Sequence, residues 1–284
     1  MEISILLAEQ ILAMFLTMAV GFGVVRAGLF KTEDSRIISN MVVYICNPCV
    51  VVHSFQIELT DDKIKGLMIA IGLSVVVHMV LIIGSEILSF IFHFNSIEKA
   101  SIIYTNAGYL VIPLVGAVLG EEWVFYTTAF ILVQTVLMWT HGVKLIGQEK
   151  ELNIRKILCN PNVIAMIIGI ALFALEIRLP TVVDSCVSGF GDMISPASMM
   201  VIGMVIGDVD LKWVFRQKRP YLICLLRLIV FPLIAVVAFA GLERSGIHPD
   251  AEYILMIVLI ATSAPAAAMI TQLAQIYGKD SRYA

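Results

Sequence analysis

Charged residues are scarce in this sequence. Asp, Glu, Lys and Arg make up only 14% of its 284 residues, whereas a soluble globular domain carries roughly 25%. So low a share excludes a large soluble domain. Because hydrophobic residues make up 60% of the chain, we predict an all-α polytopic membrane protein.

Cysteine is also scarce, and it is not arranged as a disulfide framework. The five cysteines lie mostly within apolar runs and lack the spacings of a small secreted disulfide domain. Cys46 and Cys49 have the spacing of a redox pair or of half a zinc site, but no second Cys or His pair sits at zinc spacing. We interpret both as small packing residues of a membrane helix, and we predict neither a metal site nor a cofactor.

Several catalytic motifs are missing. The sequence has no Gly-x-x-x-x-Gly-Lys phosphate loop, which argues against ATP-driven chemistry by this chain alone. It has no Gly-x-Ser-x-Gly or His-Glu-x-x-His motif, so hydrolase and metalloprotease functions lack support. Basic residues fall in the loops and set membrane topology, so they do not indicate a nucleic-acid partner. We therefore predict that the protein is not an enzyme.

Nine apolar runs approach the length of about 20 residues that a helix needs to cross a bilayer. They lie at residues 3–25, 37–55, 66–92, 100–119, 123–146, 161–175, 181–206, 221–242 and 253–277. The first run lacks the basic start of a cleaved signal peptide, so we interpret it as a span. Lys and Arg concentrate in the loops after odd-numbered spans, which places the N-terminus outside and the C-terminal end of this chain in the cytoplasm.

Proline and small polar residues interrupt four of these runs. They are Asn47 and Pro48 in the second run, Asn106, Gly108 and Pro113 in the fourth, Ser195 and Pro196 in the seventh, and Ser263 and Pro265 in the ninth. Proline removes a backbone donor, and in lipid every freed backbone group needs a partner. Interrupted helices at corresponding places in two halves indicate the binding site of a transporter.

The interruptions fall second and fourth in each of two sets of spans. We therefore predict two repeats, with five spans in residues 1–150 and four in residues 151–284, the tenth span being absent from this chain. Because five is an odd number, the second repeat should be inverted relative to the first.

Three segments resemble the auxin efflux carrier family of bacterial and plant membrane transporters. They are residues 106–114, residues 195–203 and residues 265–278. Two departures stand out, since the family usually has Gly where Val111 stands, and ten helices rather than nine. The resemblance implies a fold similar to bile-acid symporters and sodium/proton antiporters. In that fold the third to fifth and eighth to tenth spans form a core, and the remaining spans form a scaffold that joins a homodimer.

The resemblance also implies a secondary active transporter of small organic anions such as carboxylates, working by alternating access in a bacterial-type inner membrane. Protons and sodium ions both remain open as coupling ions. The physics of interrupted helices agrees, because the N-terminal ends of half-helices present free N–H groups that suit an anion. Asn47 and Asn106 would add amide donors. We expect the interrupting residues named above to form the substrate site.

Four ionisable groups inside the spans are candidates for binding the substrate or the coupling ion, namely Asp192, Glu86, His78 and Arg227. Arg227 could hold a carboxylate with its planar fork, or extend to the membrane surface beside Arg219. His78 is either a proton carrier or a hydrogen-bonded interior histidine. Glu86 either joins a proton-coupled cycle or makes an interhelical contact near the end of its span. Asp192 lies next to the seventh-span interruption, where it could bind a cation or a proton.

Two functions of other classes stay open. A non-transporting membrane sensor or partner subunit would bind a ligand without moving it across the membrane. A membrane enzyme using Asp192 or His78 as acid or base would form a product without vectorial movement. Measurements of flux and of product formation separate the three hypotheses.

Overall fold

The computed structural model describes residues 2–58, 60–147, 155, 158–210, 215–243, 248–267, 269–280 and 283. Every regular element in these residues is helical, and the one isolated β-bridge described there pairs Thr105 with Ala266. Five helical stretches are long and apolar enough to cross a membrane, namely Thr32–Ser54, Asp61–Phe92, Glu121–Gly147, Thr181–Gly207 and Lys218–Gly241. The prediction of an all-α polytopic membrane protein is confirmed.

Two of the remaining predicted spans correspond to shorter apolar helices, Pro161–Ala174 and Ala251–Ser263. The first predicted span is one helix of 25 residues, Glu2–Arg26. The predicted fourth and ninth spans are each divided into two half-helices, which explains why neither appears as one long helix. The division of the chain into two inverted repeats, residues 1–150 and 151–284, stays a prediction.

The chain forms two compact units, each built from separate stretches of sequence. The first unit contains residues Met1–Leu59, Gly108–Phe125 and Ile164–Lys218, and the second contains Thr60–Ala107, Tyr126–Val163 and Arg219–Ala284. Each unit therefore draws on both halves of the sequence. This grouping follows the scaffold and core that the family resemblance implied, except that the predicted fourth span is shared between the units.

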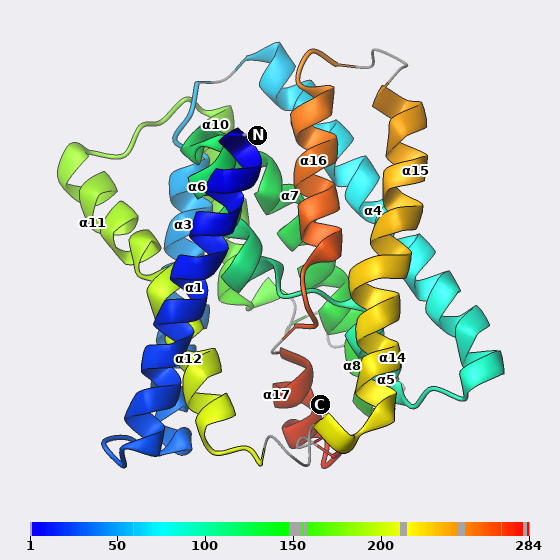
Figure 1. Cartoon of the computed structure of the whole chain (residues 1–284). Helices are drawn as coiled ribbons and strands as arrows, with labels where there is room; N and C mark the ends of the chain where they lie inside the picture. The colour runs from blue at the N-terminus through cyan, green and yellow to red at the C-terminus, as the bar shows by residue number, and fades with distance from the viewer. Residues whose placement is uncertain are drawn as a thin grey trace. The chain divides into compact units, whose positions relative to one another are not determined.

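The first unit is made of helices from the first two, the sixth and the seventh predicted spans, together with the second half of the fourth. They are α1 (Glu2–Arg26), η1 (Thr32–Asp34), α2 (Ser35–Met41), η2 (Val42–Cys46), α3 (Asn47–Ser54), α6 (Ile112–Leu119), most of α10 (Pro161–Ala174), α11 (Thr181–Asp192) and α12 (Ile194–Gly207). Helices α1 and α12 run side by side (Figure 1). Gly21 and Gly203 allow this packing, because a Cβ atom on either would collide with a backbone carbonyl of the facing helix.

The second predicted span is not interrupted at Asn47 and Pro48, so that expectation is wrong. Residues Val42–Cys46 form a π-helical turn that continues directly into α3, and Cys46 and Asn47 both keep helical backbone angles. A π-turn accommodates an extra residue inside a helix. Pro48 is the second residue of α3 and directly follows this π-turn, where the regular α-helical hydrogen bonding is already interrupted and a missing N–H is tolerated.

The seventh predicted span is likewise almost continuous. Helix α11 ends at Asp192, and α12 begins at Ile194 after a single turn residue, Met193, whose backbone angles remain near helical values. Pro196 thus lies in the first turn of α12, which is a position that suits proline. The expected break at Ser195 and Pro196 is only a turn one residue long.

The second unit contains the long helix α4 and the half-helices of the fourth and ninth predicted spans. Its elements are α4 (Asp61–Phe92), α5 (Ser96–Ile103), most of α7 (Glu121–Leu137), η4 (Met138–Gly142), α8 (Val143–Gly147), α14 (Lys218–Leu225), η5 (Leu226–Val230), α15 (Phe231–Glu243), α16 (Ala251–Ser263) and α17 (Met269–Ile276). Helix α16 packs against both α15 and α4 (Figure 1). The short π-turn η3 (Ala107–Val111) links α5 in this unit to α6 in the other.

Candidate functional site

Two interrupted helices meet inside the second unit. Helix α5 ends at Ile103 and is followed by extended backbone at Tyr104, and α16 ends at Ser263 and is followed by extended backbone at Ala264. The two extended segments pair as a short antiparallel bridge. The amide of Asn106 donates to the Pro265 carbonyl at 2.8 Å. The expected interruptions of the fourth and ninth spans are therefore real breaks.

The pairing of these segments satisfies backbone groups that no helix serves. The amide of Ala267 donates to the Tyr104 carbonyl at 3.0 Å, which completes the bridge begun by Asn106. Within a membrane such groups need partners in the protein or in a water-filled cavity. The bridge joins the first half of the fourth span to the ninth span at the point where both helices are interrupted.

Gln134 of α7 acts as a third partner of this bridge. Its Oε1 atom accepts from the Thr105 amide at 2.8 Å and from the Thr105 hydroxyl at 3.0 Å, and its Nε2 atom donates to the Thr105 carbonyl at 2.8 Å. The amide side chain thus pairs with Thr105 as a neighbouring strand would. Sequence analysis missed Gln134, although a glutamine in the apolar run 129–138 is a visible signal.

Arg227 lies at the same crossing and is only 2% exposed. Its Nε atom donates to the Ala264 carbonyl at 3.2 Å, and its Nη1 atom donates to the Ile102 carbonyl at 3.0 Å. These carbonyls belong to the C-terminal ends of α16 and α5, where unsatisfied C=O groups carry partial negative charge. The alternative position of Arg227 at the membrane surface beside Arg219 is therefore wrong.

The third nitrogen of the Arg227 guanidinium is left over. Nη2 is buried and has no hydrogen-bond partner among the described residues. A buried N–H without an acceptor costs about 1–3 kcal/mol, and more when the group is charged. Such a donor at the meeting point of two broken helices is well suited to bind an anion.

His78 of α4 is a second buried group in this unit, with no exposed surface. Its Nδ1 atom lies 2.7 Å from the Ser74 carbonyl, which can only accept, so Nδ1 carries the hydrogen. In the neutral ring Nε2 is then an acceptor, and it has no partner among the described residues. The ring packs against Phe130 with centroids 4.8 Å apart.

The other predicted residues of the two broken spans have separate surroundings. Asn106 is half-buried, Ser263 donates its hydroxyl to the Leu259 carbonyl of its own helix at 2.8 Å, and Pro265 is exposed. Pro265 contributes its carbonyl to the crossing. Pro113 lies in the first turn of α6, and its side chain is outside the described residues.

Asn47 and Gly108 come together in the first unit. A Cβ atom on Gly108 would lie 3.2 Å from Asn47 Nδ2, so the glycine leaves room for the amide. Asn47 is buried, and its Oδ1 atom has no partner among the described residues. Ser198 of α12, which sequence analysis missed, is also buried with an unpartnered hydroxyl. The first unit therefore holds polar groups of its own.

The remaining predicted residues lie in more open places. Ser195 is half-buried, while Pro196 and Asp192 are exposed at the junction of α11 and α12. Glu86 forms an ion pair with Lys99 at 2.7 Å, and its side chain is 48% exposed. That pairing fits the interhelical contact rather than a buried proton carrier.

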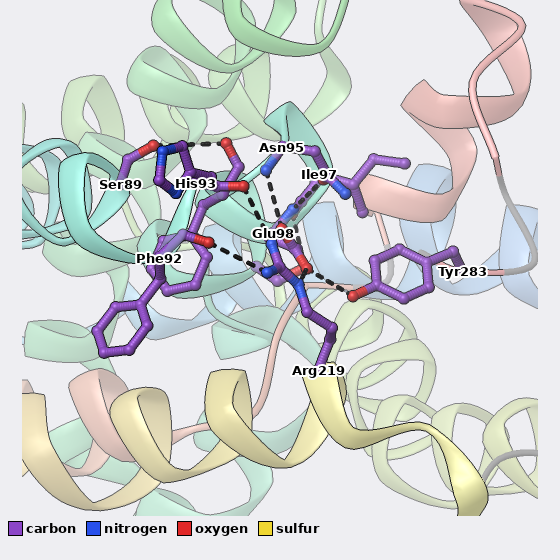
Figure 2. Close-up of polar contacts among 10 residues, drawn as sticks. Ser89, Phe92, His93, Asn95, Ile97, Glu98, Arg219 and Tyr283 are labelled. Atoms are coloured by element: carbon purple, nitrogen blue, oxygen red, sulfur yellow. Dashed lines mark hydrogen bonds and ion pairs between the residues drawn. The ribbon is translucent and has the colours of Figure 1, made fainter.

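A further cluster surrounds Glu98 at the start of α5 (Figure 2). Arg219 donates to both carboxylate oxygens, from Nε to Oε1 and from Nη2 to Oε2, each at 2.8 Å. The Tyr283 hydroxyl donates to Oε1 at 2.7 Å, and the Asn95 amide donates to Oε2 at 2.8 Å. Sequence analysis missed this cluster, although Asn95-x-x-Glu98 has the spacing of a helix capping box.

The charge of Glu98 is stabilised by these contacts. Burial alone would raise the pKa of Glu98, but the hydrogen bonds from Arg219, Tyr283 and Asn95 together hold that pKa below its ordinary value. For Tyr283, burial and the bond to the carboxylate raise the pKa to about 12. Glu98 therefore stays ionised and Tyr283 stays protonated at neutral pH.

Comparison with known proteins agrees with the helical architecture. No curated protein gives a significant match to the chain. A family model described as membrane transport protein matches residues 6–284, which is nearly the whole sequence. That match confirms the resemblance to auxin efflux carriers, and the spanning helices place the protein in the membrane. The chain belongs to the membrane transport protein family, and it is an integral membrane transporter.

Proposed function

We propose that this transporter is a secondary active carrier of small organic anions, with carboxylates as the substrate class and Arg227 as the group that binds them. One observation carries the proposal. Arg227 is buried where two broken helices cross, and its Nη2 atom has no hydrogen-bond partner among the described residues. The family resemblance supplies the expectation of alternating access.

The guanidinium is preorganised for this task. Its Nε and Nη1 atoms are held by the carbonyls of Ala264 and Ile102, so the orientation of the group is fixed before any ligand arrives. An anion reaching Nη2 would form a charge-assisted hydrogen bond in a setting of low dielectric constant. Asn106 is half-buried and follows the end of α5 at the same break. Its side-chain amide offers a second donor.

The experiment measures uptake of labelled dicarboxylates and indole carboxylates into proteoliposomes that contain the full chain. Losing one charge-assisted hydrogen bond removes about 1.5–3 kcal/mol, so Arg227→Ala should weaken the apparent affinity about 10- to 100-fold. Arg227→Lys keeps the charge without the planar fork and should retain part of the affinity. The matched control is Arg216→Ala, which removes an exposed arginine.

Each variant is checked for folding by its thermal stability with and without the anion. Stabilisation of the wild-type protein by the anion, lost in Arg227→Ala, supports the site even if that variant is less stable. Wild-type affinity in Arg227→Ala would refute it. Binding without flux in every form would support the non-transporting sensor or partner subunit instead.

A further inference from the structure

Gln134 holds both backbone groups of Thr105 at the break that follows α5. The Gln134 side chain accepts from the amide and the hydroxyl of Thr105, at 2.8 Å and 3.0 Å, and donates to the Thr105 carbonyl at 2.8 Å. Gln134 is 9% exposed and Thr105 is 1% exposed. Because water has little access to Thr105, its N–H and C=O groups depend on this side chain for their hydrogen bonds.

A glutamine is suited to this position. Its primary amide carries an acceptor and a donor side by side, as a peptide group does, so it can pair with an extended residue in the way a neighbouring strand would. The preceding residue, Tyr104, has extended backbone and is tied to the same helical stretch, because its hydroxyl donates to the Leu137 carbonyl at 3.0 Å. Helix α7 therefore fixes two consecutive residues of the break.

The ordered break continues towards Arg227 through the bridge. Asn106 follows Thr105 and donates its amide to the Pro265 carbonyl at 2.8 Å. Ala264 directly precedes Pro265, and its carbonyl accepts from Arg227 Nε at 3.2 Å. One of the two carbonyls that orient the guanidinium is thus attached to the residue that pairs with the break.

The second of these carbonyls belongs to the break itself. Ile102, three residues before Thr105, accepts from Arg227 Nη1 at 3.0 Å. If Thr105 were released, the last turn of α5 and the bridge would both lose a fixed neighbour. The orientation of Arg227 would then have to be restored when an anion binds, at a cost in conformational entropy.

We propose that Gln134 is a positioning residue of the anion site. By pairing with Thr105, it orders the break before the anion arrives and so raises the affinity for the anion without touching it. This inference rests on the proposed anion site at Arg227.

The first test measures the dissociation constant of labelled succinate or indole-3-acetate, whichever the wild-type protein binds, in proteoliposomes. Gln134→Met keeps the length of the side chain but removes the amide. A buried group left without its partner changes an equilibrium constant by about 5- to 150-fold, so the dissociation constant should rise at least about fivefold.

Two further variants show which contact matters. Gln134→Asn keeps the amide on a side chain one methylene shorter, which withdraws it from Thr105, so this variant should behave like Gln134→Met. Thr105→Val removes the hydroxyl contact and leaves both backbone contacts with Gln134, so the dissociation constant should rise less than about threefold. A loss in Thr105→Val as large as in Gln134→Met would contradict the role of the backbone pairing.

Hydrogen–deuterium exchange on the protein in nanodiscs separates positioning from a merely structural role. Without anion, the amides of Thr105 and Asn106 should exchange slowly in the wild-type protein and at least about fivefold faster in Gln134→Met. A saturating concentration of the same anion should slow them again in the variant and change them little in the wild-type protein. A purely structural defect would lower thermal stability without this protection by the anion.

Gln56→Met is the matched control, since Gln56 also accepts from a backbone amide, that of Leu179 at 2.8 Å, but lies in the first unit. It should keep the wild-type affinity and the slow exchange of Thr105 and Asn106.

The outcomes distinguish this inference from the anion site. If binding depends on Arg227 but Gln134→Met binds within about twofold of the wild-type protein, the role of Gln134 is refuted and the anion site stands. Fast exchange of Thr105 in the anion-free wild-type protein refutes that role as well, without the use of a variant. If the anion binds equally well with and without Arg227, the anion site itself is wrong.

Discussion

Replacing Arg219 by alanine should loosen the N-terminal end of α5. In the wild-type protein Arg219 donates to both oxygens of Glu98 and to the carbonyls of Phe92 and His93. Alanine would leave the Glu98 carboxylate, which is only 2% exposed, with fewer donors and without its ion pair to Arg219. The carbonyls at the end of α4 would lose their donors in the same change.

The size of the effect follows from these contacts. Removing one partner of a buried ion pair destabilises a protein by about 3–5 kcal/mol. The side chain of Arg219 is 47% exposed, so water screens part of the interaction, and we expect about 2–3 kcal/mol here. Because about 1.4 kcal/mol corresponds to a factor of ten, local opening should become about 30- to 150-fold more frequent.

Hydrogen–deuterium exchange on the protein in nanodiscs measures this opening directly. Amides in residues 93–99 should exchange faster by the stated factor in Arg219→Ala, while amides of α1, which lies in the other unit, should not change. Arg216→Ala removes a neighbouring exposed arginine and should leave exchange unaltered. An increase below about threefold in Arg219→Ala would refute the reasoning, since the buried carboxylate would then not depend on its partner.

Two further predictions concern Glu98 and Asn106 of the second unit. The lowered pKa of Glu98 means that its contribution to stability is complete above the ordinary value of 4.5 and is lost as the pH falls through the lower folded-state pKa. Thermal unfolding should therefore show a loss of stability on acidification below that value that is absent in Glu98→Gln, and equal acid sensitivity in both would contradict it. Asn106→Ala should weaken anion binding in proteoliposomes while the protein remains in the membrane, and unchanged binding in this variant would remove the Asn106 amide from the site.

The positions of the true breaks were predictable only in part. Pro265 lies in the break that follows α16, and Gly108 lies shortly after the break that follows α5. The sequence therefore indicated both of these interruptions. Pro48 and Pro196 look the same in the sequence, but each falls in the first turn of a following helix, where proline is tolerated. The sequence shows where a proline stands. Whether the helix breaks there depends on where the following helix begins relative to that proline.

The surroundings of the buried charges could not be predicted from sequence. Arg227 reaches the Ile102 carbonyl across 125 residues of chain and the Ala264 carbonyl across 37. Both partners are backbone carbonyls, so no pattern of residue types in the sequence indicates these contacts. Glu98 was overlooked for a different reason, because its capping-box spacing is local while its partner Arg219 is 121 residues away.

The contacts of Arg227 also bear on how the membrane voltage acts on transport. Each helix C-terminus carries about half a negative charge, so the ends of α5 and α16 together nearly balance one guanidinium. The empty crossing is thus close to electrically neutral, whereas the same crossing with one monovalent anion bound at Arg227 would carry about one negative charge. An uncompensated charge moved through the bilayer changes in energy by about 2.3 kcal/mol per 100 mV. An anion that crossed on Arg227 alone would carry one charge across the membrane, so the membrane voltage as well as the concentration gradient would set its direction.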